Sequence, residues 1–272
     1  MTLFSEVFNK ASIYDMLFFN VKAVLIHPTL DELEKNNKPM FERWKYISET
    51  KYLIENLGSY LDEAKQSNVD INNRFNELYQ SKAPYYPEFC KIVAMTHATL
   101  YTENGELKRD IKKIASEDES LIIQTLMSEF TLLSNAAIKS KPEFFPPLCG
   151  HNITNYDIPL LIKRFFLYGS GFENNQLPLI LKRSLDAKPW ESSVIDTVNV
   201  WKFNGHEYTS LMLIADYLGL KKTVDLLPHD ELSKYYWENI GEKPKETLDF
   251  MLLQSATQTN LVIQLMNKLR QF

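Results

Sequence analysis

The residues with the clearest chemical potential lie in segment 150–159, where Asp157 comes directly before an apolar run typical of a helix. A carboxylate in this position can bind a hard cation, or it can cap the helix by accepting a backbone N–H. The sequence contains no Gly-rich phosphate loop and no Gly-x-Ser-x-Gly elbow, and its five histidines lack the spacing of zinc ligands. The remaining candidate for chemistry in this segment is therefore the Asp157 carboxylate.

Two polar residues, Asn20 and Lys22, lie at the end of an apolar run that begins at Met16. Such a short continuous run predicts a buried strand. Residues i and i+2 of a strand point to the same face, so Asn20 and Lys22 are expected to lie side by side. Asn offers one neutral acceptor oxygen, whereas Lys offers only donors and a positive charge.

Four blocks of the chain together resemble the DEDD-type 3′-5′ exonucleases, in particular the exonuclease-like proteins related to the proofreading domain of B-family DNA polymerases. The resemblance covers nearly the whole chain, and implies an α/β, ribonuclease-H-like fold with a mixed sheet flanked by helices on both faces. The blocks are residues 16–22, Gly150-His151-Asn152-Ile153-Thr154-Asn155-Tyr156-Asp157, Lys188-Pro189-Trp190-Glu191 leading to Ile195-Asp196-Thr197, and a terminal helix from about Thr247.

The chain departs from this family at most of the metal-binding acids. Where the family carries Asp-x-Glu, this chain has Asn20 and Lys22, and where it carries Tyr-x-x-x-Asp, the best placement gives Gln254 and Gln258. Asp157 is then the only retained family acid. Four carboxylates roughly neutralise two divalent ions, but one carboxylate beside one ammonium does not. We therefore expect no bound metal and no catalysis.

Three functions remain open from the sequence. The first is a binding module that keeps a groove for single-stranded DNA or RNA ends, with contacts from Lys22, Asn152 and Tyr156. The second is a scaffold that binds a protein partner and regulates it. The third is a residual 3′-5′ exonuclease that uses Mg²⁺ or Mn²⁺ with Asp157 and either Asp249 or another acid.

The resemblance also makes a geometric prediction. Asn20, Lys22 and Asp157 should converge under the terminal helix, with the Lys22 ammonium close enough to Asp157 for a direct or water-bridged pair. His151 is expected to be a structural hydrogen-bonding residue, and Asp196 is expected to hold a loop or strand end.

The bulk composition fits a globular protein with a sizeable core. The chain has 272 residues, of which 44% are hydrophobic and 24% charged, and the net charge of −5 gives no global electrostatic signature of nucleic-acid binding. Its two cysteines, Cys90 and Cys149, predict reduced buried thiols. The sequence has no signal-peptide pattern and no apolar run of the ~20 residues that span a bilayer, so we expect a cytoplasmic protein without membrane contact.

The pattern of elements predicts one domain over residues 1–272, with a helical insertion at about 29–82. Ser116 and Glu119 form a capping-box pattern before a helix to about Lys139. The remaining expected strands are 89–101, an edge strand from 107 after a turn at 103–106, 148–151 and 194–197; the remaining expected helices are 158–168, 210–218 and 247–269.

Overall fold

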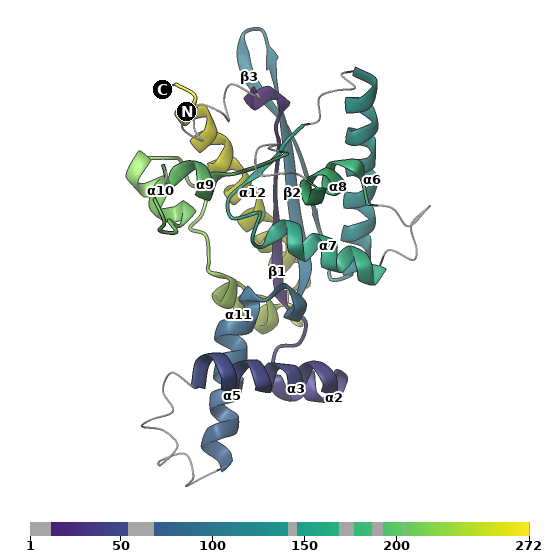
Figure 1. The fold of residues 1–272 in the computed structure, drawn as a ribbon, viewed down its shortest axis with the longest axis vertical. Coiled ribbons are helices and arrows are strands. Elements are labelled where there is room, and N and C mark those ends of the chain that lie inside the picture. The colour runs from purple at the N-terminus through teal and green to yellow at the C-terminus, as the bar shows by residue number, and fades with distance from the viewer. Residues whose placement is uncertain are drawn as a thin grey trace. The chain divides into compact units, whose positions relative to one another are not determined.

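The computed structural model describes residues 12–53, 68–140, 146–168, 177–186, 193–203 and 205–271. One of the sequence patterns, the Lys188–Glu191 block, lies outside these ranges. The chain forms two compact units. The first comprises Met1–Lys22, Ile92–Leu227 and Pro244–Phe272, and the second comprises Ala23–Lys91 and Pro228–Lys243. Figure 1 labels their elements.

A five-stranded mixed sheet with the order β3-β2-β1-β4-β5 confirms the predicted α/β class. Strands β2 and β3 are antiparallel, whereas β1, β4 and β5 are parallel neighbours. This arrangement is consistent with the ribonuclease-H-like fold. The bounds are β1 Leu17–Leu25, β2 Cys90–Glu103, β3 Glu106–Ala115, β4 Leu148–Gly150 and β5 Val194–Asp196.

Strand β1 has no exposed residue along its nine positions. A parallel strand covered on both faces reads as a continuous apolar run, which is why its sequence lacks alternation. Phe18 packs in a core cluster with residues of the terminal helix, whereas the ring of Phe19 meets that of Phe130 edge-on, with centroids 6.1 Å apart. Adjacent strand residues point to opposite faces. Helices therefore cover both faces, as predicted.

The predicted hairpin joins β2 to β3. Asn104 and Gly105, at its tip, have φ values of 53° and 80°. A two-residue turn of this kind requires positive φ at both positions, which Asn and Gly adopt most readily. Strand β3 then lies at the sheet edge, as its run of charged residues indicated. Charged side chains protect an edge strand from pairing with other chains.

The first unit also contains a short 3-10 helix, Ile13–Asp15, and six α-helices in its described part. They are α6 Glu119–Ser140, α7 Asp157–Tyr168, α8 Leu179–Asp186, α9 Thr197–Trp201, α10 Leu211–Leu218 and α12 Pro244–Leu269. No helix in the described part of the chain is both long enough and apolar enough to cross a membrane.

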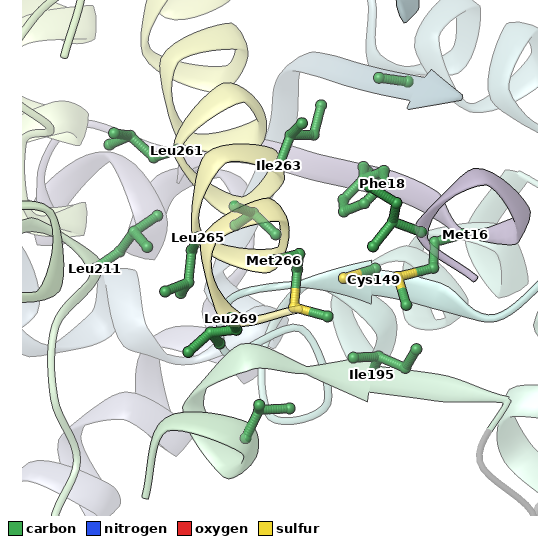
Figure 2. Close-up of a cluster of buried hydrophobic side chains, with 14 of the residues drawn as sticks. Met16, Phe18, Cys149, Ile195, Leu211, Leu261, Ile263, Leu265, Met266 and Leu269 are labelled. Carbon is green, nitrogen blue, oxygen red and sulfur yellow. The ribbon is translucent and has the colours of Figure 1, made fainter. Parts of the chain in front are cut away.

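The core beside α12 is made by apolar side chains of β1, β4, β5, α10 and α12 (Figure 2). Leu265 and Met266 of α12 are fully buried in this cluster, as are Phe18 and Cys149 of the neighbouring strands. Both cysteines of the chain are free thiols and buried, as the sequence predicted. This packing fixes α12 against the sheet, and so places the polar middle of the helix over β1.

The second unit contains the helices predicted between 29 and 82, together with α11, which comes from far along the sequence. Trp44 is fully buried at its centre, and the ring of Phe89 lies 5.1 Å from it. Trp237 donates its indole N–H to the Leu25 carbonyl at 3.0 Å, which ties α11 to this unit. The elements are α2 Leu30–Asn36, α3 Lys38–Ile47, a π-helical turn Ser48–Leu53, α5 Asn68–Lys82, 3-10 turns Ala83–Tyr85 and Pro87–Phe89, and α11 His229–Asn239. One domain over the whole chain stays a prediction.

The capping box predicted at Ser116 and Glu119 is wrong. Helix α6 begins at Glu119, and the Glu119 carboxylate turns into the core, where it accepts the Ile92 backbone N–H at 2.7 Å and pairs with the Arg164 guanidinium. Both charged side chains are less than a tenth exposed. The Glu119 carboxylate is engaged in a tertiary ion pair because the buried guanidinium requires a charged partner. Asp118 caps the helix instead, by accepting the Ser120 backbone N–H at 2.9 Å.

We predict that Glu119→Gln destabilises the protein by about 3–5 kcal/mol, since it leaves the buried Arg164 charge without a counter-ion. The matched control is Glu77→Gln, which breaks an exposed ion pair with Arg74 and should cost under about 1 kcal/mol. Urea denaturation of both variants measures the difference. Equal unfolding free energies for the two variants would contradict this role of Glu119.

Candidate functional site

The candidate site lies where β1 runs past the carboxyl end of β4. Phe18 pairs with Cys149, so Gly150 ends β4 beside Phe19, and Asn20 is the next residue of β1. A Cβ on Gly150 would lie 2.9 Å from the Phe19 carbonyl oxygen and 2.3 Å from Ile153 Cγ2. Only glycine therefore fits here without displacing backbone. This close approach lets the chain turn after β4 directly beside β1.

Asp196, the last residue of β5, holds this turn in place. Its carboxylate accepts the backbone N–H groups of Asn152 at 2.8 Å, Thr154 at 3.0 Å and Val198 at 3.0 Å. Asn152 adopts a φ of 62°, a left-handed conformation that asparagine tolerates better than most residues. The predicted role of Asp196 as a holder of the strand end is confirmed.

Asp157 begins α7, and its carboxylate reaches across to β1. One carboxylate oxygen accepts the Val21 backbone N–H at 3.0 Å and the Asn20 side-chain amide at 3.2 Å. Asp157 is buried, with 3% of its surface exposed. Its carboxylate therefore joins α7 to β1 as a tertiary contact, which goes beyond the capping role that its position also allowed.

Lys22 is buried as well, with 4% of its surface exposed, and so it does not extend to solvent. Its ammonium donates to the side-chain oxygen of Gln258 on α12 at 2.5 Å. The hydroxyl of Ser255, one turn earlier on α12, donates to the Asn20 carbonyl at 3.0 Å. The predicted convergence of Asn20, Lys22 and Asp157 under the terminal helix is thus observed. The hydrogen-bond partner of Lys22, however, is Gln258 and not Asp157.

Burial changes the pKa values of Lys22 and Asp157 more than their mutual attraction does. Burial lowers the pKa of Lys22 to about 8, although the Asp157 charge opposes this shift. Burial likewise raises the pKa of Asp157 to about 7, against the stabilising effects of the Val21 hydrogen bond and the Lys22 charge. The loss of hydration therefore brings the pKa of each group close to neutral pH.

The donor set of this site does not fit a divalent ion. Asn20 and Gln258 offer neutral amide oxygens, Lys22 offers an ammonium, and Asp157 is the one carboxylate among these four. Within the described residues, no three histidines, cysteines or acids cluster in a way that could hold a metal. Asp249 precedes Gln258 by nine residues on α12, about 13 Å along the helix axis, so it does not supply the missing acid.

The other residues assigned to the site from sequence are placed differently. His151 shares a 2.9 Å hydrogen bond with the Thr197 hydroxyl, and burial lowers its pKa to about 4, which agrees with the structural role expected of it. Tyr156 is buried, with 5% of its surface exposed, and Asn152 accepts a hydrogen bond from the Asn155 amide. Nucleic-acid contacts by Tyr156 and Asn152 stay predictions.

Two further residues border the site: Gln254, which the resemblance placed at the family's tyrosine position, and Tyr208, which was not predicted. Gln254 is fully buried and hydrogen-bonds both the Asp225 carbonyl and the Leu227 N–H, at 2.9 and 3.0 Å. Tyr208 lies with its ring 6.0 Å from that of His151, and burial together with nearby Asp196 raises its pKa. The placement of Gln254 came from the family resemblance, whereas no sequence pattern pointed to Tyr208.

No protein-family model, curated protein or solved structure matches the chain. The function has to be inferred from the residues and their geometry.

We predict that the pair of Lys22 and Asp157 makes the protein least stable between pH about 7 and about 8. Folded Asp157 retains a proton that the unfolded carboxyl, with a pKa of 3.8, releases early, so stability falls as the pH rises toward 7. Folded Lys22 loses its proton before the unfolded amine does at 10.5, so stability rises again above pH 8.

Urea unfolding as a function of pH checks this prediction. A Lys22→Met, Asp157→Asn double variant removes both titrations. Its gain in stability over the wild type should be largest between these two pKa values, where both groups destabilise the wild type. Parallel profiles for the two proteins would show that the pair does not titrate in this range.

Proposed function

We propose that this chain is an exonuclease-like protein that does not hydrolyse phosphodiesters and that holds single-stranded nucleic-acid ends. The observation that carries the loss of catalysis is the buried hydrogen bond from Lys22 to Gln258, where the resemblance implies metal ligands. On this proposal, the Lys22 ammonium stands where the family's divalent ion would bind. The absence of hydrolysis is a proposal about chemistry, and it does not depend on how strongly the protein binds nucleic acid.

Electrostatics supports this proposal. Two unit charges about 4 Å apart interact by ~4 kcal/mol at an effective dielectric of about 20. Exchanging a carboxylate for the Lys22 ammonium therefore turns a large attraction for a divalent ion into a repulsion of similar size. Asp157 is in addition held by two hydrogen bonds from β1, which occupy one of its oxygens. Two-metal catalysis requires the opposite arrangement.

The role of Lys22 in this proposal differs from the one first expected. Lys22 is buried and bonded to Gln258, so a phosphate would reach its ammonium only if α12 moved away from β1. The proposal therefore assigns Lys22 to the cohesion of β1 with α12, and assigns nucleic-acid contact to exposed cations.

A protein-binding scaffold is the second candidate, because the first unit carries an exposed aromatic cluster. Phe203 and Tyr217 are 58% and 78% exposed, and both rings lie within 6.2 Å of Trp201. Phe203 holds a φ of 45°, which is unusual for a bulky residue and often marks a functional position. Aromatic residues are enriched in the cores of protein interfaces.

We predict that the purified protein does not shorten single-stranded or double-stranded DNA from the 3′ end in the presence of Mg²⁺ or Mn²⁺. Gel analysis of end-labelled DNA measures this, with Asp157→Ala as the matched control for contaminating nuclease. Metal-dependent digestion by the wild type that disappears in Asp157→Ala would refute the non-catalytic proposal.

We also predict that a triple variant with Asn20→Asp, Lys22→Glu and Gln258→Asp acquires a divalent-ion site. These three positions converge with Asp157, so the exchange restores both the ligand count and the charge. Mn²⁺ at about 100 times its dissociation constant should then stabilise the variant by about 2.7 kcal/mol.

Thermal unfolding with and without Mn²⁺ reads this out, and the wild type should show no such shift. Adding Asp157→Asn to the triple variant should abolish the shift. A triple variant that is folded but unaffected by Mn²⁺ would contradict the proposed correspondence of these positions with metal ligands.

A further inference from the structure

An open groove of about 600 Å³ lies between the edge strand β3 and the first turns of α12. Its volume is in the range of sites that hold a drug-sized ligand, which is also the size class of a nucleotide. Both elements belong to the first unit. The groove is lined by Lys113, Ile114 and Ala115 of β3 and by Pro244, Lys245, Leu248, Asp249 and Leu252 of α12.

Two exposed lysines, Lys113 and Lys245, give the groove a positive rim. Neither side-chain ammonium forms a hydrogen bond or an ion pair within the described part of the chain, although Lys113 pairs with Thr96 through its backbone and Lys245 belongs to α12. Lys112, their neighbour on β3, differs because it pairs with Glu129 at 2.6 Å. Asp249 is the one acidic residue that lines the groove, so the rim carries a net charge of +1 from these three side chains (two lysines minus one aspartate).

Apolar side chains line the rest of the groove. Leu248 and Leu252 of α12 are both partly exposed there. Arg109, on the same face of β3 as Lys113, hydrogen-bonds Asn260 of α12 and so keeps the strand turned toward the helix. Proteins that bind single strands combine cations for the phosphates with flat or apolar surfaces for the bases.

The groove also lies close to the candidate site along α12. Leu252 precedes Gln258 by six residues, which corresponds to about 9 Å along the helix axis. The groove and the candidate site therefore lie on the same helix, within two turns of each other. Lys22 is buried and offers no accessible charge, whereas Lys113 and Lys245 are exposed on the rim of the groove.

We infer that this groove is the contact site for the phosphates and bases of a single-stranded nucleic acid, with Lys113 and Lys245 as the phosphate contacts. The inference rests on the proposed function, because it assigns the surface by which the protein holds a single strand. The phosphates lie against the rim, and the bases lie on the leucine side chains of α12.

Fluorescence anisotropy with a 3′-labelled oligo(dT) at low salt tests this inference. Lys113→Glu and Lys245→Glu should each weaken binding severalfold. Each should also make the negative slope of log K against log salt shallower by about 0.7, the value for one phosphate contact of a single strand. Asp249→Asn should tighten binding, because it removes the negative charge from the rim. These are exposed positions, so circular dichroism should show unchanged folding for all three variants.

Lys108→Glu is the matched control. It makes the same charge change on the same strand, but Lys108 points to the opposite face from Lys113 and already pairs with Glu106 at 2.9 Å. If the groove and not the net charge governs binding, the affinity of the Lys108→Glu variant should stay within about twofold of the affinity of the wild type.

The possible failures are distinguishable. If Lys113→Glu with Lys245→Glu binds as the wild type does, the groove assignment is overturned while single-strand binding stands. If the wild type does not bind oligo(dT) at all, both the groove and the single-strand part of the proposed function fall. Equal binding of poly-L-glutamate would show that the groove selects negative charge alone, which overturns the nucleic-acid assignment.

Discussion

A buried ammonium group constrains the centre of the first unit. Removing a charge from water is costly, so Lys22 requires acceptors wherever the fold encloses it. Gln258 supplies one on α12, and the charge of Asp157 at the start of α7 supplies a second attraction. Strand β1 is thereby joined to two helices that come from distant parts of the chain. Both helices thus contribute groups that offset the positive charge of Lys22.

The same constraint favours neutral hydrogen-bonding side chains around Lys22 over additional carboxylates. An amide at 258 is a good acceptor for the Lys22 ammonium, and the amide of Asn20 is a good donor to Asp157. Carboxylates at these positions would instead need cations to offset their mutual repulsion. The polar centre is consistent within itself as a set of hydrogen bonds, so it holds the fold together without an ion.

Much of the fold followed from local sequence patterns. The continuous apolar run before Asn20 predicted β1, and the turn at 103–106 predicted the hairpin. The helix expected over 210–218 is α10, which ends at Gly219 with a φ of 64°. These features depend on residues near each other in sequence. The convergence of Asn20 with Asp157 followed from strand geometry together with the family resemblance.

Contacts between distant segments could not be predicted in the same way. Glu119 matched a capping box, but its carboxylate serves Arg164, which comes 45 residues later. Lys22 was expected beside Asp157, yet its hydrogen bond goes to Gln258 because the packing of α12 decides which acceptor lies within reach. The grouping of α11 with residues 23–91 likewise left no local pattern. Such choices depend on three-dimensional packing, which a single sequence does not encode locally.

Gly150 has a consequence for how such chains diverge. Any larger residue there would collide with the Phe19 carbonyl and with Ile153, whatever the protein does. Selection for folding alone is therefore sufficient to preserve this glycine, and Asp196 is kept in the same way by the three backbone groups that it holds. The residues that fix the turn after β4 are thus set by backbone geometry alone. They carry no information about the chemistry of the neighbouring Lys22 and Asp157 side chains.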